Sequence, residues 1–267
     1  MRTTFAVVVV GTLVAIASPL AAQTGKTTDL PYLGTWKLNI AKSDFGETTV
    51  TFAENASGEM QFTAAGQSYK FRTDSKDYSA LFGRTAAWKQ IDPTTWETVI
   101  KQDGRTIVTD TTKLSSDGKT LTVSSKGPKP AGDTFEQTTV YERVSGGPGL
   151  AGKWRTKNIQ NSAPAAIELA RSGEGMAIRI PDFKISADLK FDGKDYPATG
   201  PDLPLGLTLA IEKTGPRSFD LTEKQHGKPI FKLSFEVSED GNTLTETGGP
   251  VGVAEKFKAV YDRQGRT

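Results

Sequence analysis

The sequence predicts an all-β protein of two tandem, antiparallel, up-and-down β-barrels, each with about eight to ten strands. Three observations support this fold class. The chain repeats its own motifs over more than a hundred residues, hydrophobic residues alternate with polar ones, and Asp-Gly pairs separate the alternating segments. The repetition predicts two domains. The alternation and the tight turns predict that strands adjacent in sequence pair with each other.

The repetition is that of a tandem duplication. Several motifs recur in the same order in the two halves of the chain, at offsets between 118 and 123 residues. A period this long is that of a whole domain, so each copy is expected to have its own core and to fold when expressed alone. The paired segments are "LGTWKLN" (33–39) with "LAGKWRTKN" (150–158), "SKDYSA" (75–80) with "GKDYPA" (193–198), "TTWETVIKQDGR" (94–105) with "RSFDLTEKQHGK" (217–228), "LSSDGKTLT" (114–122) with "VSEDGNTLT" (237–245), and "VYERV" (140–144) with "VYDRQ" (260–264).

The first 22 residues have the three-part pattern of a secretory signal peptide. Arg2 gives a positive start, residues 5–16 are mostly apolar, and small residues up to Ala22 offer a cleavage site. The apolar run is shorter than the roughly 20 residues that a transmembrane helix needs. The mature protein is therefore expected in the periplasm or outside the cell, without an integral membrane segment.

The duplication also sets the expected domain boundaries. Gly and Pro are dense between the two copies, which is typical of a short linker that leaves the domains side by side. The predicted division is 1–22 signal peptide, 23–31 flexible N-terminal segment, 32–145 first barrel, 146–149 linker, and 150–267 second barrel.

Hydrophobic alternation identifies the strands. In "FKLSFEV" (231–237) every second residue is apolar, which places one face of a strand in a core. Residues 163–176 are rich in Ala, Glu and Leu, which favour helix, but their counterpart at 48–60 is strand-like. We therefore predict strand, turn and strand over 163–176. Asp-Gly pairs tolerate the positive φ of tight hairpins, and they stand at 103–104, 117–118, 192–193 and 240–241.

The composition excludes several classes of function. The formal net charge is only +2, which gives no electrostatic footprint for nucleic acid or an anionic membrane surface. With Cys 0 and His226 as the single histidine, a thiol nucleophile and a Cys/His zinc site are excluded. His226 lies in a turn and is expected to be solvated. The prediction is a protein with no catalytic residue, no metal and no cofactor, and not an enzyme.

The ends of each copy resemble the first and last strands of calycins, the superfamily of lipocalins and fatty-acid-binding proteins. The resemblance rests on "GTWKLN" and "VYERV" and on their counterparts, and it extends over nearly the whole mature chain. It implies that a cation of the last strand lies over the first-strand tryptophan at the closed end of the barrel. Carried over within each copy, Arg143 would cover Trp36 and Arg263 would cover Trp154. A cation over an indole face contributes about 0.5 to 2 kcal/mol.

Two departures from that resemblance bear on the ligand. Fatty-acid-binding proteins hold the ligand carboxylate with an arginine two residues before the last-strand tyrosine, where this chain has Thr139 and Ala259. They also carry a helical lid after the first strand, for which residues 40–47 are too few. A free fatty acid is therefore not the expected ligand.

Aromatic residues are the remaining candidates for a binding site. Most acidic residues are expected on solvated faces or in turns. In the repeated "KDY" motif Asp77 and Asp195 are expected to cap the turn while the tyrosine packs inward, and a ligand contact is the alternative. Plain core packing is the other interpretation of the aromatic set. The candidate ligand-binding residues are Tyr69, Phe71, Trp88, Trp96 and Tyr141 in the first copy, and Phe231 and Phe235 in the second.

The leading functional hypothesis is an exported, non-catalytic protein that binds or carries a small hydrophobic molecule in a barrel cavity. The first copy, richer in aromatics, is the better candidate for the cavity. An alternative is an envelope-stress or protein-interaction module with filled barrels. A third is an isomerase or hydrolase acting at a barrel mouth, which a buried acid or tyrosine with a perturbed pKa would favour.

Overall fold

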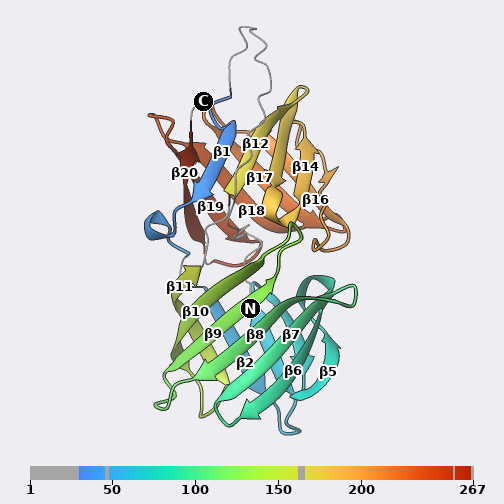
Figure 1. The fold of residues 1–267 in the computed structure, drawn as a ribbon, viewed down its shortest axis with the longest axis vertical. Helices are drawn as coiled ribbons and strands as arrows, with labels where there is room; N and C mark the ends of the chain where they lie inside the picture. The colour runs from blue at the N-terminus through green and yellow to red at the C-terminus, as the bar shows by residue number, and fades with distance from the viewer. Residues whose placement is uncertain (1–29, 46–47, 162–165, 255, 266–267) are drawn as a thin grey trace.

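The structure, a computed structural model, describes residues 30–45, 48–161, 166–254 and 256–265. These residues form two antiparallel sheets of ten strands, each curled into a nearly closed barrel (Figure 1). The described residues contain no α-helix and only three short 3-10 turns. The predicted all-β fold of two up-and-down barrels is confirmed. The predicted signal peptide lies outside the described residues.

The strands of the two sheets do not follow the two copies. Strand β1 (Gly34–Leu38), from the first copy, pairs with β12 and β20 of the second copy. Its counterpart β11 (Gly152–Asn161), from the second copy, pairs with β2 and β10 of the first. We call the sheet of β2 to β11 the first barrel, and the sheet of β12 to β20 with β1 the second barrel. The first barrel is thus one continuous segment inserted between two strands of the second.

Sequence neighbours pair through the rest of each sheet. The first barrel also contains β2 (Thr49–Glu54), β3 (Met60–Ala64), β4 (Gln67–Phe71), β5 (Asp74–Ser79), β6 (Thr85–Asp92), β7 (Thr95–Gln102), β8 (Arg105–Leu114), β9 (Thr120–Pro128) and β10 (Thr134–Ser145). The second contains β12 (Ala166–Ser172), β13 (Gly175–Ile180), β14 (Ile185–Leu189), β15 (Tyr196–Pro197), β16 (Leu207–Lys213), β17 (Ser218–Gln225), β18 (Lys228–Val237), β19 (Thr243–Pro250) and β20 (Phe257–Gln264). The 3-10 turns are η1 (Ile40–Lys42), η2 (Leu81–Gly83) and η3 (Pro181–Phe183).

The short segment between the copies accounts for this exchange. Only residues 146–151 separate the end of β10 from the start of β11. A connection this short joins antiparallel neighbours in one sheet at low entropic cost, so β11 pairs with β10. The predicted linker 146–149 is therefore the middle of a hairpin loop. The predicted boundaries 32–145 and 150–267 describe the duplication and not the sheets, because each range lacks one strand of its barrel.

Local sequence patterns behave as predicted. Strand β18 directs Phe231, Leu233, Phe235 and Val237 inward, each at most 7 % exposed. The segment with helical propensity forms the β12–β13 hairpin, which confirms strand, turn and strand over 166–176; residues 163–165 lie outside the described residues. Helical propensity is overruled here because the apolar residues follow a two-residue period that suits a half-buried strand.

Each barrel is closed at one end by a tryptophan beneath an arginine, but the partners differ from the predicted ones. The Arg263 guanidinium lies 4.0 Å from the Trp36 ring centre, and the Arg143 guanidinium lies 4.0 Å from that of Trp154. The predicted pairs Trp36–Arg143 and Trp154–Arg263 are wrong because the two first strands are exchanged. Both tryptophans are fully buried.

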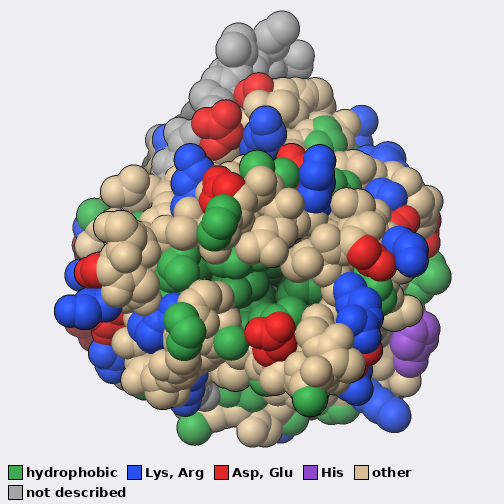
Figure 2. Space-filling model, turned by 90° about the horizontal axis from the view of Figure 1, so that it is seen from below, with side chains coloured by type: hydrophobic (Ala, Val, Ile, Leu, Met, Phe, Trp, Pro, Cys, Tyr) green, Lys and Arg blue, Asp and Glu red, His purple; other side chains and the backbone are tan. Residues whose placement is uncertain are grey.

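Figure 2 shows the molecule from below, where hydrophobic side chains line a central hollow and charged side chains surround it.

The open ends of the two barrels face each other along the long axis of the molecule (Figure 1). Arg84, at the mouth of the first barrel, donates from Nη2 to the carbonyl oxygen of Asp202 in the second at 3.1 Å. Arg105 forms an ion pair with the Asp202 carboxylate. The backbone of Ala131 also donates to the carbonyl of Asp182 at 3.2 Å. These contacts place loops of the first barrel over the mouth of the second.

Candidate functional site

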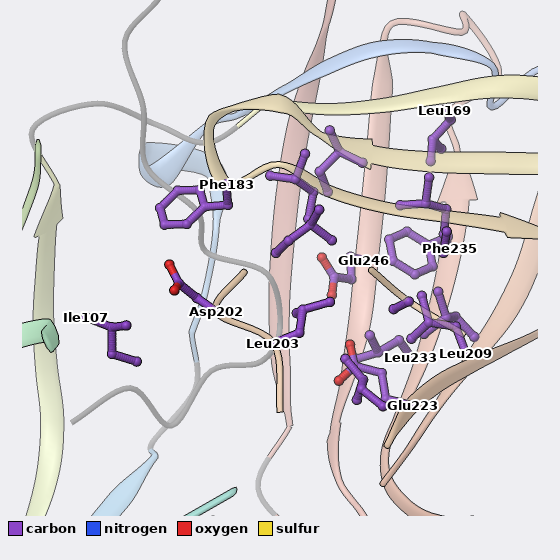
Figure 3. Close-up of a pocket in the computed structure, with 18 of the residues that line it drawn as sticks. Ile107, Leu169, Phe183, Asp202, Leu203, Leu209, Glu223, Leu233, Phe235 and Glu246 are labelled. Carbon is purple, nitrogen blue, oxygen red and sulfur yellow. The ribbon is translucent and has the colours of Figure 1, made fainter. Parts of the chain in front are cut away.

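An apolar cavity of about 100 Å³ occupies the mouth of the second barrel. Its walls are inward-facing residues of β12 to β14 and β16 to β19, and the first barrel contributes Ile107, Val108, Pro128 and Phe135 on the opposite side. Figure 3 shows Ile107 at one side of the view and Glu223 and Glu246 farther across, with Asp202 and Leu203 between them. Aliphatic and phenyl groups make up nearly the whole lining, so the cavity favours an apolar occupant. The strands supply these groups because alternate residues along each strand are apolar.

Two glutamates enter this apolar wall from neighbouring parts of one sheet. Glu223 on β17 and Glu246 on β19 are only 5 % and 1 % exposed, and both line the cavity (Figure 3). Strand β18 lies between β17 and β19 and pairs with both strands, and its Phe235 stands opposite Glu246. Tyr261 on β20 donates its hydroxyl to Glu246 Oε2 at 2.6 Å. Glu246 Oε1 and Glu223 Oε2 have no protein hydrogen-bond partner.

Burial raises the pKa of Glu246 to about 7, although the hydrogen bond from Tyr261 opposes the shift. Burial also raises the pKa of Glu223 well above its ordinary value, and the nearby Glu246 adds to that increase by repulsion. The pKa of Tyr261 is raised by burial and by the Glu246 carboxylate. Two carboxyl groups that lose their water cannot both ionise without a compensating cation. The pair therefore holds protons at a pH where exposed glutamates have lost them.

The sequence prediction placed most acidic residues on solvated faces or in turns and did not single out these two. A signal was present in the alternation. Glu223 follows Phe219 and Leu221 at two-residue spacing on β17, and Glu246 follows Leu244 at the same spacing on β19. Because side chains alternate between the two faces of a strand, both glutamates point to the same side as these apolar residues, into the barrel. Asp110 on β8 is a third exception, 4 % exposed inside the first barrel.

Three aromatic residues proposed from the sequence fill the first barrel together. The Trp88 indole stacks on Phe71 with ring centres 4.4 Å apart, and its Nε1 donates to the Tyr69 hydroxyl at 2.9 Å. Phe52, which was not among the candidates, packs edge-on to Trp88 at 5.7 Å. Two small interior cavities, of about 20 and 30 Å³, lie beside this cluster, and Tyr69 lines both. The structure therefore places the larger cavity in the second barrel and not in the first.

The remaining candidates are spread over the molecule. Trp96 on β7 and Tyr141 on β10 are buried in the first barrel, and Tyr141 lines the smaller of the two interior cavities there. Phe235 lines the cavity of the second barrel and stacks on Phe219 with ring centres 4.8 Å apart. Phe231 lines a separate groove between the two barrels. Of the seven candidates, Phe235 alone lines the larger cavity.

The repeated "KDY" motif and His226 have structural surroundings. Asp77 forms an ion pair with Lys101 at 2.8 Å, and Asp195 forms one with Lys224. The turn backbone is capped by earlier residues: Asp74 accepts from the Lys76 amide, and in the second copy Asp192 accepts from the Lys194 amide. The expected capping role of Asp77 and Asp195 is thus corrected. His226 is exposed in its turn, as predicted.

No cluster of three or more His, Asp or Glu side chains suited to a metal ion occurs in the part of the chain that the structure describes. Within the same ranges no helix is long and apolar enough to cross a membrane. No family model, curated protein or solved structure matches the chain. The apolar cavity of the second barrel and its two buried glutamates are therefore the features that bear on function.

Proposed function

We propose that the protein is an exported, non-catalytic, lipocalin-like binding protein that holds a small hydrophobic molecule in the second barrel. The observation that carries this proposal is the apolar cavity of about 100 Å³ at the barrel mouth. A cavity on this scale accommodates about one small ring rather than a long acyl chain. Export to the periplasm or beyond is supported by the N-terminal sequence pattern.

The first barrel has a supporting role in this proposal. Its own interior is filled by the cluster around Trp88, while Ile107 and Phe135 cover the mouth of the second barrel. A ligand would therefore be enclosed on one side by a barrel and on the other by the face of its neighbour. The alternative of an interaction module requires two filled barrels, and the cavity of the second barrel favours binding over that alternative.

Filling the cavity tests the proposal. Ala187 on β14 is 3 % exposed and lines the cavity, so Ala187→Leu introduces three carbons into the binding space. The matched control is Ala86→Leu, at a buried alanine of the first barrel. Native mass spectrometry of the purified protein, with toluene added as a probe, should show bound toluene in the wild type and in the control. Equal toluene binding by Ala187→Leu would contradict the proposed site.

The buried acids favour a second candidate, a barrel-mouth enzyme that moves protons. A Glu246 pKa of about 7 suits a general acid or base at neutral pH, and Tyr261 holds that carboxyl in place. In this case the variant Glu246→Gln should still bind the molecule and lose its turnover. Under the binding proposal the wild type returns a bound molecule chemically unchanged, which mass spectrometry of the released ligand would show.

A further inference from the structure

The buried glutamates point to a particular ligand chemistry. Glu223 and Glu246 each present a carboxyl oxygen without a protein partner in a cavity that is otherwise almost entirely apolar. Resting on the proposed function, we propose that the second barrel binds a small hydrophobic amine, whose ammonium group pairs with these two carboxyl groups while its apolar body fills the cavity.

The fold itself does not require these acids. The motif alignment places Ile100 of the first barrel opposite Glu223, and Val123 opposite Glu246. The first barrel thus closes with apolar residues at both positions, and each is inward-facing on its strand. A buried carboxyl group that lacks hydrogen-bond partners destabilises a protein, and more so when it is ionised. The pair of acids in this one cavity is therefore best explained by what the cavity binds.

The charges around the pair leave room for a cationic ligand. Among the described residues that line the cavity, Arg84 is the one cation. Its guanidinium donates to the Gln102 side chain and to the Asp202 carbonyl at the mouth. The other acid in the lining, Asp202, is paired with Arg105. Glu246 accepts a hydrogen bond from Tyr261, and Glu223 lies close enough to Glu246 for their charges to repel. A positive group is therefore the missing complement of the pair.

The amine class also follows from comparison with other donors. An alcohol donates one hydrogen bond and leaves an ionised carboxylate uncompensated, whereas an ammonium group donates up to three and carries the opposite charge. A carboxylic acid adds a like charge and is disfavoured. Ligands with the same ring and different polar ends therefore separate the contribution of charge from that of apolar burial.

Calorimetric titration of the full-length protein with toluene, benzylamine, benzyl alcohol and benzoate tests the inference at pH 8. Benzylamine should bind at least about tenfold more tightly than benzyl alcohol, the factor that one compensated charge contributes. Benzoate should bind most weakly. Benzyl alcohol or benzoate binding as tightly as benzylamine would overturn the amine inference and leave the hydrophobic site intact. Failure of all four to bind would overturn the proposed function as well.

Substitutions of Glu223 and Glu246 test whether these two residues cause the preference for benzylamine. Glu246→Gln and, independently, Glu223→Gln should remove most of the benzylamine advantage, measured within each variant as the ratio of its benzylamine affinity to its benzyl alcohol affinity. The matched control is Asp110→Asn, which neutralises the buried acid of the first barrel and should leave the advantage intact. Benzylamine affinity should also fall as the pH drops from 8 to 5, because the ligand must then displace a proton from the pair. An advantage that survives in both glutamine variants would overturn the inference.

Discussion

The Arg263 guanidinium lies 4.0 Å from the centre of the Trp36 ring and donates to the carbonyl oxygens of Leu33, Pro31 and Gly241. The two residues come from opposite ends of the described chain and stand opposite each other in the β1–β20 ladder. Arg143 and Trp154 repeat the arrangement in the first barrel, where they are close in sequence. One pair is therefore made by a local hairpin and the other by the longest-range strand pairing of the fold.

The exchanged pairing predicts which residues are energetically coupled. A double-mutant cycle of Trp36→Leu with Arg263→Gln should give a coupling of about 1 kcal/mol in the free energy of unfolding, measured in urea. The same cycle of Trp36→Leu with Arg143→Gln should give a coupling near zero, because those side chains lie in different barrels. Coupling to Arg143 in place of Arg263 would show that the first strands are not exchanged.

The strand order predicts which fragment folds. Residues 48–161 contain every strand of the first barrel, including β11. This fragment should unfold cooperatively and show a β-type circular dichroism spectrum. The fragment 32–145, which follows the duplication, lacks β11 and leaves β2 and β10 with unpaired edges, so it should be less stable or associate. Equal stability of the two fragments as monomers would show that β1 can replace β11.

The glycine two residues before Trp154 is predicted to be essential. Gly152 has φ +149°, and a Cβ at this position would lie 2.5 Å from the Ser145 carbonyl oxygen and 2.8 Å from Arg143 Nη1. Gly152→Ala should therefore lower the free energy of unfolding by about 2 kcal/mol or more. The control Gly58→Ala also has a positive φ but meets no atom within 4 Å, and it should lose only about 1 kcal/mol. Urea denaturation compares the two, and equal losses would count against the steric explanation.

The buried carboxyls predict that stability falls as the pH rises. Burial raises the pKa of Glu246 from 4.5 to about 7 in the folded state, so the folded protein holds a proton that the unfolded chain releases. This stabilisation is complete below pH 4.5 and is lost as the pH rises through 7, a change of roughly 3 kcal/mol. Glu223, whose pKa is also raised, acts in the same direction.

Replacement of Glu246 by glutamine, which carries no titrating proton, should flatten much of this dependence. Free energies of unfolding between pH 5 and 8.5 provide the measurement. Asp110→Asn serves as the control and should leave the contribution of Glu246 in place. A wild-type profile that does not fall over this range would show that the pair is hydrated or compensated by a cation.

Much of the fold could be predicted because its signals are local. The alternation in "FKLSFEV" identifies an inward-facing β18, and the same rule, applied to every acid, would have placed Glu223 and Glu246 inside the second barrel. Tyr69, Phe71 and Trp88 were each singled out from the sequence, and they meet in one cluster although β4 and β6 do not pair. The packing of this cluster into a filled interior, however, depends on side-chain volumes from several strands, which a sequence pattern does not specify.

The sequence by itself determined two β-barrels, their hairpins, and a Trp and an Arg at the end of each. Only the tertiary structure decided which first strand closes which barrel, because "GTW" and "GKW" offer nearly the same edge to either sheet. Chain connectivity broke that degeneracy: the short loop between β10 and β11 makes their pairing local, and β1 then completes the other barrel. The cavity between the barrels is a consequence of how the two mouths meet, which no segment of the sequence encodes alone.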